Sequence, residues 1–176
     1  MTTDASASRS WMWGPCSRLG LGVFLVTLAL DQAHKWWMLN VYGIADRGRV
    51  TVTPFLDLVY VKNIGISYSM FDQESYAGQI MLAAFGVVAT LALWAWLARG
   101  AGNRLLAVSL GLIMGGAIGN AIDRVALGGV ADFFSLHAFG FYWYVFNIAD
   151  VAIVAGVIGL LYDSLTASRK DAAKSL

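Results

Sequence analysis

Four aspartates lie in stretches of apolar sequence, where carboxylates are rare. Asp123, Asp132 and Asp150 fall within residues 115–150, and Asp31 falls in another apolar stretch nearer the N-terminus. An ionised carboxylate in apolar surroundings costs several kcal/mol unless it is paired or neutralised. We therefore expect some of these aspartates to take part in chemistry.

A pair of carboxylates that shares one proton is the chemistry that these residues fit. Two close carboxylates in a medium of low dielectric constant cannot both ionise, so one takes a proton from water while the other, protonated, polarises a carbonyl group. A cation site built from Asp123, Asp132 and Asp150 would suit a hard metal ion, but no His or Glu lies at ligand spacing. The residues alone leave a hydrolase and a proton-coupled transporter as alternatives.

The composition is typical of a membrane protein. Of the 176 residues, 59% are hydrophobic and 13% are charged, whereas a soluble domain usually has about 25% charged residues. The net charge of +1 provides no bulk attraction to nucleic acid. A single cysteine excludes a disulfide scaffold and a cysteine-rich metal site.

Four apolar stretches predict an all-α membrane protein with four transmembrane helices in a single domain, residues 19–163. The predicted spans are residues 19–39, 76–98, 105–123 and 141–162. In the third span Gly111, Gly115 and Gly119 recur every four residues, a spacing that lets another helix approach closely. In the first span Asp31 and Lys35 are four residues apart, so they share a helix face and can form an ion pair.

Two polar interruptions are predicted on the outer membrane face. Residues 40–75 alternate apolar and polar residues and are rich in β-branched side chains, which predicts a small β element; residues 124–140 are a second short segment. Residues 1–18 and 164–176 are predicted cytoplasmic tails. This orientation places seven Lys and Arg residues inside and five outside, in the direction that the positive-inside rule favours.

In this arrangement the aspartates converge on the outer half of the membrane. Twelve uncharged residues precede Asp31 and twelve follow Asp150. At about 1.5 Å per helical residue, both lie roughly 18 Å above the cytoplasmic boundary, and Asp123 and Asp132 lie nearer the outer surface. Arg124 follows Asp123 directly, which favours an ionised carboxylate with a structural role, whereas Asp132 and Asp150 have no adjacent cation in the sequence.

Five sequence blocks resemble, in order, the signature blocks of lipoprotein signal peptidase, also called signal peptidase II. They are DQAHK (31–35), NIGISYSMF (63–71), GGAIGNAIDR (115–124), VADF (130–133) and FNIAD (146–150). Each block alone has little specificity, but the five extend in order from the first predicted span to the fourth. The resemblance implies a multi-pass aspartyl peptidase of the bacterial inner membrane with its active site toward the periplasm. Such enzymes cleave signal peptides from prolipoproteins just before a diacylglyceryl-modified cysteine.

The resemblance also implies roles for individual residues. It makes Asp132 and Asp150 the catalytic pair. Other motif positions would support the site or bind substrate and inhibitors such as globomycin; they are Asp31, Lys35, Asn63, Gly65, Asp123, Arg124, Asn147 and Ala149. Asn120 joins this group because it lies three residues before Asp123 on the same helix face.

Two positions depart from the family pattern: residues 66–68 (ISY) follow Gly65, and His34 replaces the usual Ser or Thr. These departures concern substrate contacts and not the catalytic pair.

We expect no cofactor and no metal. The expected partners are diacylglyceryl-modified prolipoproteins and membrane lipids, with no nucleic acid, and the chain is expected to act as a monomer. Two alternatives remain: a small proton-coupled transporter or channel subunit that uses the same carboxylates, and a scaffold whose charges pair between helices.

Overall fold

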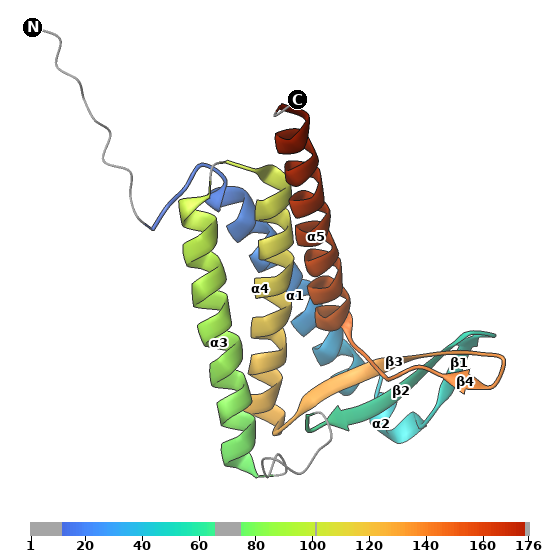
Figure 1. Cartoon of the computed structure of the whole chain (residues 1–176). Coiled ribbons are helices and arrows are strands. Elements are labelled where there is room, and N and C mark those ends of the chain that lie inside the picture. Colours follow the sequence, from blue (N-terminus) through green and yellow to red (C-terminus); the bar gives the residue numbers. More distant parts are fainter. Residues whose placement is uncertain (1–11, 66–74, 101, 175–176) are drawn as a thin grey trace, which may run out of the picture.

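The computed structural model describes residues 12–65, 75–100 and 102–174. These residues are mostly helical and include a small antiparallel sheet (Figure 1). The helices are α1 (Ser17–Asn40), α2 (Ile44–Arg47), α3 (Tyr76–Arg99), α4 (Arg104–Leu127) and α5 (Ile148–Lys174). The strands are β1 (Val50–Thr53), β2 (Leu56–Asn63), β3 (Val130–Ala138) and β4 (Phe141–Tyr142).

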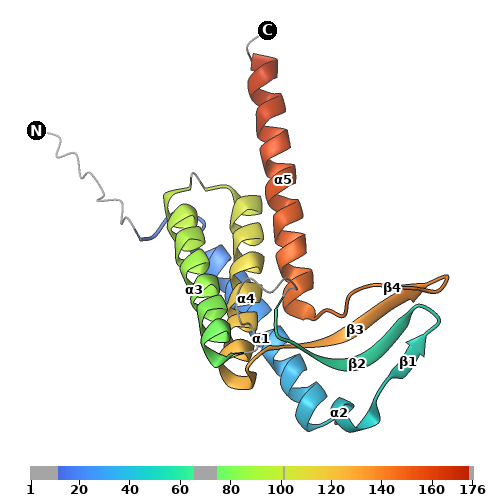
Figure 2. The same ribbon diagram turned by 60° about the horizontal axis from the view of Figure 1, so that its bottom comes forward.

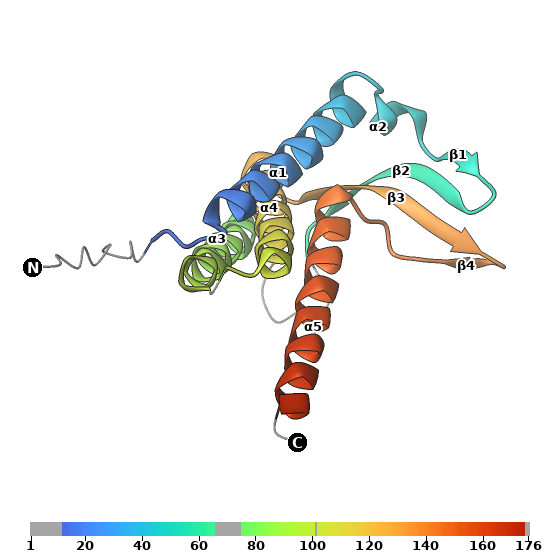
Figure 3. The same cartoon turned by 90° about the horizontal axis from the view of Figure 1, so that it is seen from above.

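Helix α4 is the centre of the helical bundle, with α1, α3 and α5 packed around it (Figures 1 and 3). The start of α1, the connection between α3 and α4, and the end of α5 lie at one end of the bundle (Figure 1). The sheet lies at the opposite end and projects sideways from the helices (Figures 1 and 2).

Glycines let α4 approach its neighbours closely. A Cβ atom at Gly115 would lie 2.6 Å from the Thr27 Cβ atom of α1, and one at Gly119 would collide with the Asp31 carboxylate. The predicted contact of Gly115 and Gly119 with another helix is therefore confirmed. The sequence pattern missed Gly116, where a Cβ would lie 2.5 Å from the Ala149 carbonyl oxygen of α5.

The sheet has the order β1-β2-β3-β4, and every neighbouring pair is antiparallel. It is more extensive than predicted, because residues 130–138 pair with β2 as strand β3 instead of forming a separate segment. Its inner face packs on a small core of Met38, Ile44, Ala131 and Phe133. Pairing of Val61 with Asp132 and of Asn63 with Val130 brings the second and fourth sequence blocks side by side.

The fourth long helix begins later than predicted. Residues 141–142 form β4, Phe146 bridges to Phe134, and α5 starts only at Ile148. The apolar run from residue 141 gives no sign of this boundary, because strand pairing with β3 decides the conformation of residues 141–146. Asp150 therefore lies in the first turn of α5 and not in the middle of a span.

Three described helices are long and apolar enough to cross a membrane: α3, α4 and residues Ile148–Thr166 of α5. Helix α1 has the same length as α3, 24 residues, but its second half carries Asp31, Gln32, His34 and Lys35. Length and composition therefore identify three candidate spans among the described helices, and the fourth predicted span, in α1, stays a prediction.

Candidate active site

Lys35 is the centre of a buried ionic cluster where α1 meets α4. Its Nζ atom lies 2.8 Å from Asp31 Oδ2 and 2.8 Å from Asp123 Oδ2, and it donates a hydrogen bond to Asn120 Oδ1 at 3.1 Å. Asp31, Lys35 and Asp123 are at most 3% exposed. The predicted ion pair between Asp31 and Lys35 is confirmed, and Asp123 shares the same cation.

Asp123 does not pair with the adjacent Arg124 as its sequence position suggested. Successive side chains on a helix point in directions about 100° apart, so neighbours in sequence do not face each other. Arg124 Nη1 instead donates to the Asn120 carbonyl oxygen at 3.1 Å. Asp123 Oδ2 also accepts a hydrogen bond from the Ala131 backbone nitrogen at 3.1 Å, which ties the end of α4 to β3.

Asp31 and Gln32 join α1 to α4 and α5. Asp31 Oδ1 accepts a hydrogen bond from the Ala149 nitrogen at 3.0 Å, which satisfies one of the unpaired N–H groups at the start of α5. Gln32 Nε2 donates to Asp123 Oδ1 and to the Gly119 carbonyl oxygen, both at 3.1 Å. Gln32 was not predicted as a site residue, although an amide beside Asp31 in an apolar helix was a usable signal.

Asn147 caps helix α5 and holds Asp150 in place. The Asn147 Oδ1 atom accepts a hydrogen bond from the Asp150 nitrogen at 3.0 Å, and Asp150 Oδ2 accepts one from the Asn147 nitrogen at 3.2 Å. This reciprocal pattern is a capping box with Asp in place of the usual Glu. An acidic side chain in the first turn of a helix also interacts favourably with the positive end of the helix dipole.

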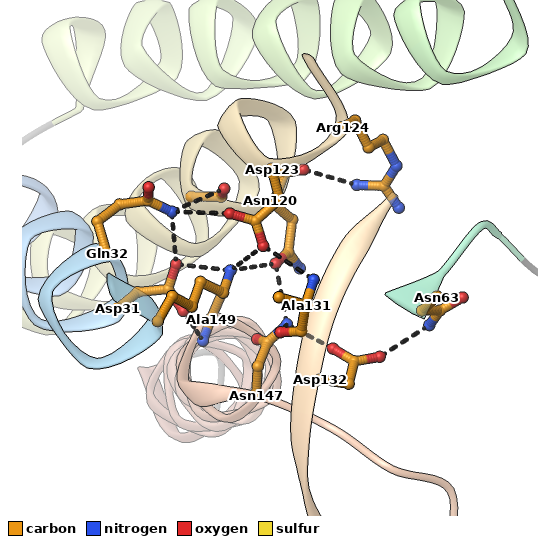
Figure 4. A network of polar contacts seen from close by, with 12 residues as sticks. Asp31, Gln32, Asn63, Asn120, Asp123, Arg124, Ala131, Asp132, Asn147 and Ala149 are labelled. Atoms are coloured by element: carbon orange, nitrogen blue, oxygen red, sulfur yellow. Dashed lines mark hydrogen bonds and ion pairs between the residues drawn. The ribbon is translucent and has the colours of Figure 1, made fainter. Parts of the chain in front are cut away.

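Two asparagine side chains connect Asp132 to Asp150. Asn147 Nδ2 donates to Asp132 Oδ1 at 2.7 Å and to Asn120 Oδ1 at 3.1 Å. Asn120 Nδ2 in turn donates to Asp150 Oδ1 at 3.0 Å. Figure 4 shows Asp132 between Asn147 on one side and Asn63 on the other. The two aspartates thus belong to one network, although 17 residues lie between them in the sequence.

Asp132 is a buried carboxyl group on the central strand β3. It is 1% exposed, and Asn63 Nδ2 donates to its Oδ2 atom at 3.0 Å. Burial raises the pKa of Asp132 from 3.8 to about 6; the Asn63 and Asn147 amides and the Lys35 charge oppose this rise, and the Asp150 charge adds to it. A carboxyl group with such a pKa exchanges its proton near neutral pH.

The network divides the four aspartates into two kinds. Asp31 and Asp123 share the Lys35 cation. Among the ion pairs of the described residues, none involves Asp132 or Asp150, which accept hydrogen bonds from neutral amides. The described residues also contain no group of three or more His, Cys, Asp or Glu side chains arranged to hold a metal ion.

A cavity of about 810 Å³ opens beside Asp132. One side is formed by the end of β2 and the residues after it, which include Asn63 and Gly65, and the other by Trp143, Tyr144 and Val145. Gly65 has φ +115°, and its nitrogen donates to Asn63 Oδ1 at 3.0 Å, so this turn holds the amide that contacts Asp132. The sequence did not single out Trp143 and Tyr144.

All predicted site residues lie in the described part of the chain and take part in the network or its backbone contacts, Gly65 through the hydrogen bond from its nitrogen to Asn63. Their predicted roles in catalysis and binding remain predictions.

Of the two departures from the family pattern, residues 66–68 lie outside the described residues. The His34 ring stacks on Phe134 with 5.2 Å between ring centroids, so it packs against the sheet.

Comparison with known proteins identifies a family and close relatives of this chain. A family described as Signal peptidase (SPase) II matches residues 23–166. The lipoprotein signal peptidase of Methylobacterium sp. (strain 4-46) is 52% identical over 156 residues, 88% of this chain and 94% of that protein. The lipoprotein signal peptidase of Rhodopseudomonas palustris (strain ATCC BAA-98 / CGA009) is 54% identical over 152 residues, 84% of this chain and 92% of that protein.

Solved structures of bacterial membrane enzymes have the same fold. One superposes with a TM-score of 0.73 at 27% identity and covers 84% of this chain and 93% of that chain. A second has a TM-score of 0.69 at 25% identity, with coverage of 86% and 90%. Since the family match covers most of the chain, the protein belongs to the signal peptidase II family of lipoprotein signal peptidases.

Proposed function

We propose that this membrane protein is an aspartic endopeptidase that removes signal peptides from prolipoproteins, cutting before a diacylglyceryl-modified cysteine. The observation that carries the proposal is the amide-linked pair of Asp132 and Asp150, which have no cationic partner among the described ion pairs. Asp132 also lines the cavity of about 810 Å³. Membership of a peptidase family favours this reading over a transporter or a scaffold.

The environments of the two aspartates suggest different roles. Asp150 accepts hydrogen bonds from the Asn147 nitrogen just before α5 and from the Asn120 amide of α4, and we assign it as the base that takes a proton from the attacking water. Asp132, whose pKa is raised to about 6, serves as the acid. The water oxygen adds to the scissile carbonyl carbon, and protonated Asp132 donates a hydrogen bond to the developing oxyanion. The C–N bond then breaks, and the leaving amine takes a proton from the pair.

The surrounding residues support this pair. Asn63, Asn120 and Asn147 orient the two carboxyl groups, and the Lys35 cluster fixes the helices that carry them. Arg124 is partly buried, and its Nε atom has no hydrogen-bond partner among the described residues. We assign this guanidinium group to binding a substrate carbonyl.

We further propose that α1 is a fourth membrane span and that the sheet and the site lie on the periplasmic side of the inner membrane. Of the polar side chains of α1 that were unfavourable for a span, Asp31, Gln32 and Lys35 make ion pairs or hydrogen bonds inside the bundle. Arg99 and Arg104 lie at the opposite end, where the positive-inside rule expects cytoplasmic residues. The proposed partners are diacylglyceryl-modified prolipoproteins and membrane lipids, and the proposed active form is a monomer.

The test is cleavage of a purified prolipoprotein with and without the diacylglyceryl group by the protein in detergent. Asp132→Asn and Asp150→Asn should each cleave the modified substrate at least ~100-fold more slowly, because each loses a group that transfers a proton. Asp46→Asn, which removes an exposed carboxylate of α2, is the matched control and should cleave normally. Near-normal turnover by either site variant, or loss of cleavage in EDTA, would contradict the aspartyl mechanism.

A further inference from the structure

The wall of the substrate cavity formed by residues 143–145 is held at its two ends. The Trp143 nitrogen donates to the Leu136 carbonyl oxygen at 2.8 Å, and the Phe146 nitrogen donates to the Phe134 carbonyl oxygen at 3.1 Å. Tyr144, between these two contacts, is 87% exposed. The position of this wall therefore depends on what fixes β4 just before it.

A polar cluster crosses the sheet next to this wall. It consists of Arg49, Asp57, His137 and Tyr142, which come from the residue before β1 and from β2, β3 and β4. We call it the sheet clasp. Arg49 Nη1 lies 2.8 Å from Asp57 Oδ2, and His137 Nε2 lies 3.3 Å from Asp57 Oδ1.

Tyr142 connects the clasp to the wall. Its ring stacks on the His137 ring with 5.0 Å between centroids, and the Arg49 guanidinium carbon lies 5.3 Å from the Tyr142 ring centroid. The next residue after Tyr142 is Trp143, the first residue of the wall. The contacts that hold Tyr142 against His137 and Arg49 therefore also set the direction in which the wall leaves the sheet.

Asp57 is the buried residue that contacts both Arg49 and His137. It is 2% exposed, and its hydrogen bond with Arg49 is the main cause that lowers its pKa below the usual value of 3.8. The Arg49 contact thus favours the ionised form of this carboxylate. Removing its charge would free Arg49, whose side chain is 48% exposed, to leave its place over Tyr142.

The opposite side of Trp143 is only partly packed by other side chains. A second, apolar cavity of about 330 Å³ is lined by Phe55, Leu136, His137, Ala138, Phe141 and Trp143. Trp143 thus lines both cavities, and its ring contacts the Phe141 ring with 6.1 Å between centroids. The clasp adds a side-chain restraint to the backbone hydrogen bonds that hold Trp143 and Phe146.

We propose that Arg49, Asp57 and His137 are positioning residues that set the aromatic wall of the substrate cavity and so determine how tightly an extended apolar peptide segment is bound. This proposal rests on the proposed function. The clasp residues do not touch the carboxyl groups of Asp132 and Asp150 in any hydrogen bond or ion pair of the described residues. The clasp therefore acts on binding and leaves the chemical step unchanged.

The kinetic experiment separates binding from chemistry. Asp57→Asn should raise KM for the diacylated prolipoprotein about 10-fold and leave kcat within about 2-fold, because pre-organisation of the wall is lost while the catalytic pair is intact. Arg49→Met should act in the same way, and it keeps the proposal testable if Asp57→Asn does not fold. Arg49→Lys keeps a cation for Asp57 and should restore part of the affinity. Asp46→Asn is the matched control and should have wild-type kinetics.

A second readout needs no catalysis. A spin label on Tyr144→Cys, in a Cys16→Ser background, should become more mobile when Asp57→Asn is added and should not change with Asp46→Asn. Unchanged KM and unchanged mobility in the clasp variants would overturn the inference, as would a fall in kcat at constant KM. A wild-type protein that cleaves no prolipoprotein would contradict the proposed function, and the spin-label result would still decide whether the clasp holds the wall.

Discussion

At the scale of residues, the four aspartates differ in whether they pair with Lys35. Lys35 pairs with both Asp31 and Asp123, so these two carboxylates join α1 to α4. Asp132 and Asp150 receive hydrogen bonds from neutral amides, which orient a carboxyl group without supplying a positive charge. The proton transfer that we propose for Asp132 and Asp150 is therefore not opposed by a cationic partner among the described ion pairs.

The pH dependence of cleavage should follow the proton on Asp132. Because its pKa is raised from 3.8 to about 6, the free enzyme loses this proton as the pH rises through about 6. If protonated Asp132 is the acid, kcat/KM should fall above that pH by about tenfold per pH unit. The measurement is kcat/KM for a diacylated prolipoprotein from about pH 4.5 to about pH 8.5. A rise through this range would make Asp132 the base instead.

Asp31 should be needed for folding more than for chemistry. Asp31→Ala leaves the Ala149 nitrogen without its acceptor and leaves Lys35 with Asp123 as its one carboxylate partner in the cluster. Breaking a buried ion pair typically lowers the free energy of unfolding by about 3–5 kcal/mol. Thermal unfolding in detergent should show this loss, with folded yield reduced at least as much as turnover. A well-folded variant with no activity would place Asp31 among the catalytic residues.

At the scale of elements, local patterns were predictable and long-range pairing was not. The pairing of Asp31 with Lys35 and the contacts of Gly115 and Gly119 follow from the helical repeat alone. The start of α5 does not, because the run FYWYVF (141–146) is apolar enough to continue the helix. Its backbone bonds with Leu136 and Phe134, on a strand that the sequence reading did not identify, decide its conformation.

The close contact between α4 and α1 gives a prediction at this scale. Gly119→Ala places a methyl group against the Asp31 carboxylate, so this side chain must leave its contacts with Lys35 and Ala149 or the helices must separate, and the melting temperature in detergent should fall. Gly22→Ala is the matched control, because a Cβ at Gly22 of α1 would meet nothing within 4 Å. Since Ala favours helix more than Gly does, this control should melt at the same or a higher temperature. Equal melting of the wild type and Gly119→Ala would contradict the close contact.

At the scale of the whole molecule, the polar network is gathered at one end of an apolar bundle. The hydrogen bond between Asp31 and Ala149 joins residues 118 positions apart in the sequence. Spacing and periodicity do not predict contacts over such a distance. For this reason the residues alone indicated that the carboxylates converge on the outer half of the membrane and that Asp132 and Asp150 lack an adjacent cation, but not that these two aspartates meet in space.

The direction of the molecule in the membrane can be tested with two cysteines in a Cys16→Ser background. Asp46→Cys probes exposed α2, which leads into the sheet, and Arg104→Cys probes the exposed start of α4 at the opposite end. We expect a membrane-impermeant thiol reagent to label the first in intact spheroplasts and the second only after lysis. The physical reason is that Arg99 and Arg104 flank a short connection, where positive charge most strongly favours the cytoplasm. The reverse labelling pattern would place the sheet, and with it Asp132, on the cytoplasmic side, where a periplasmic substrate could not reach the catalytic pair.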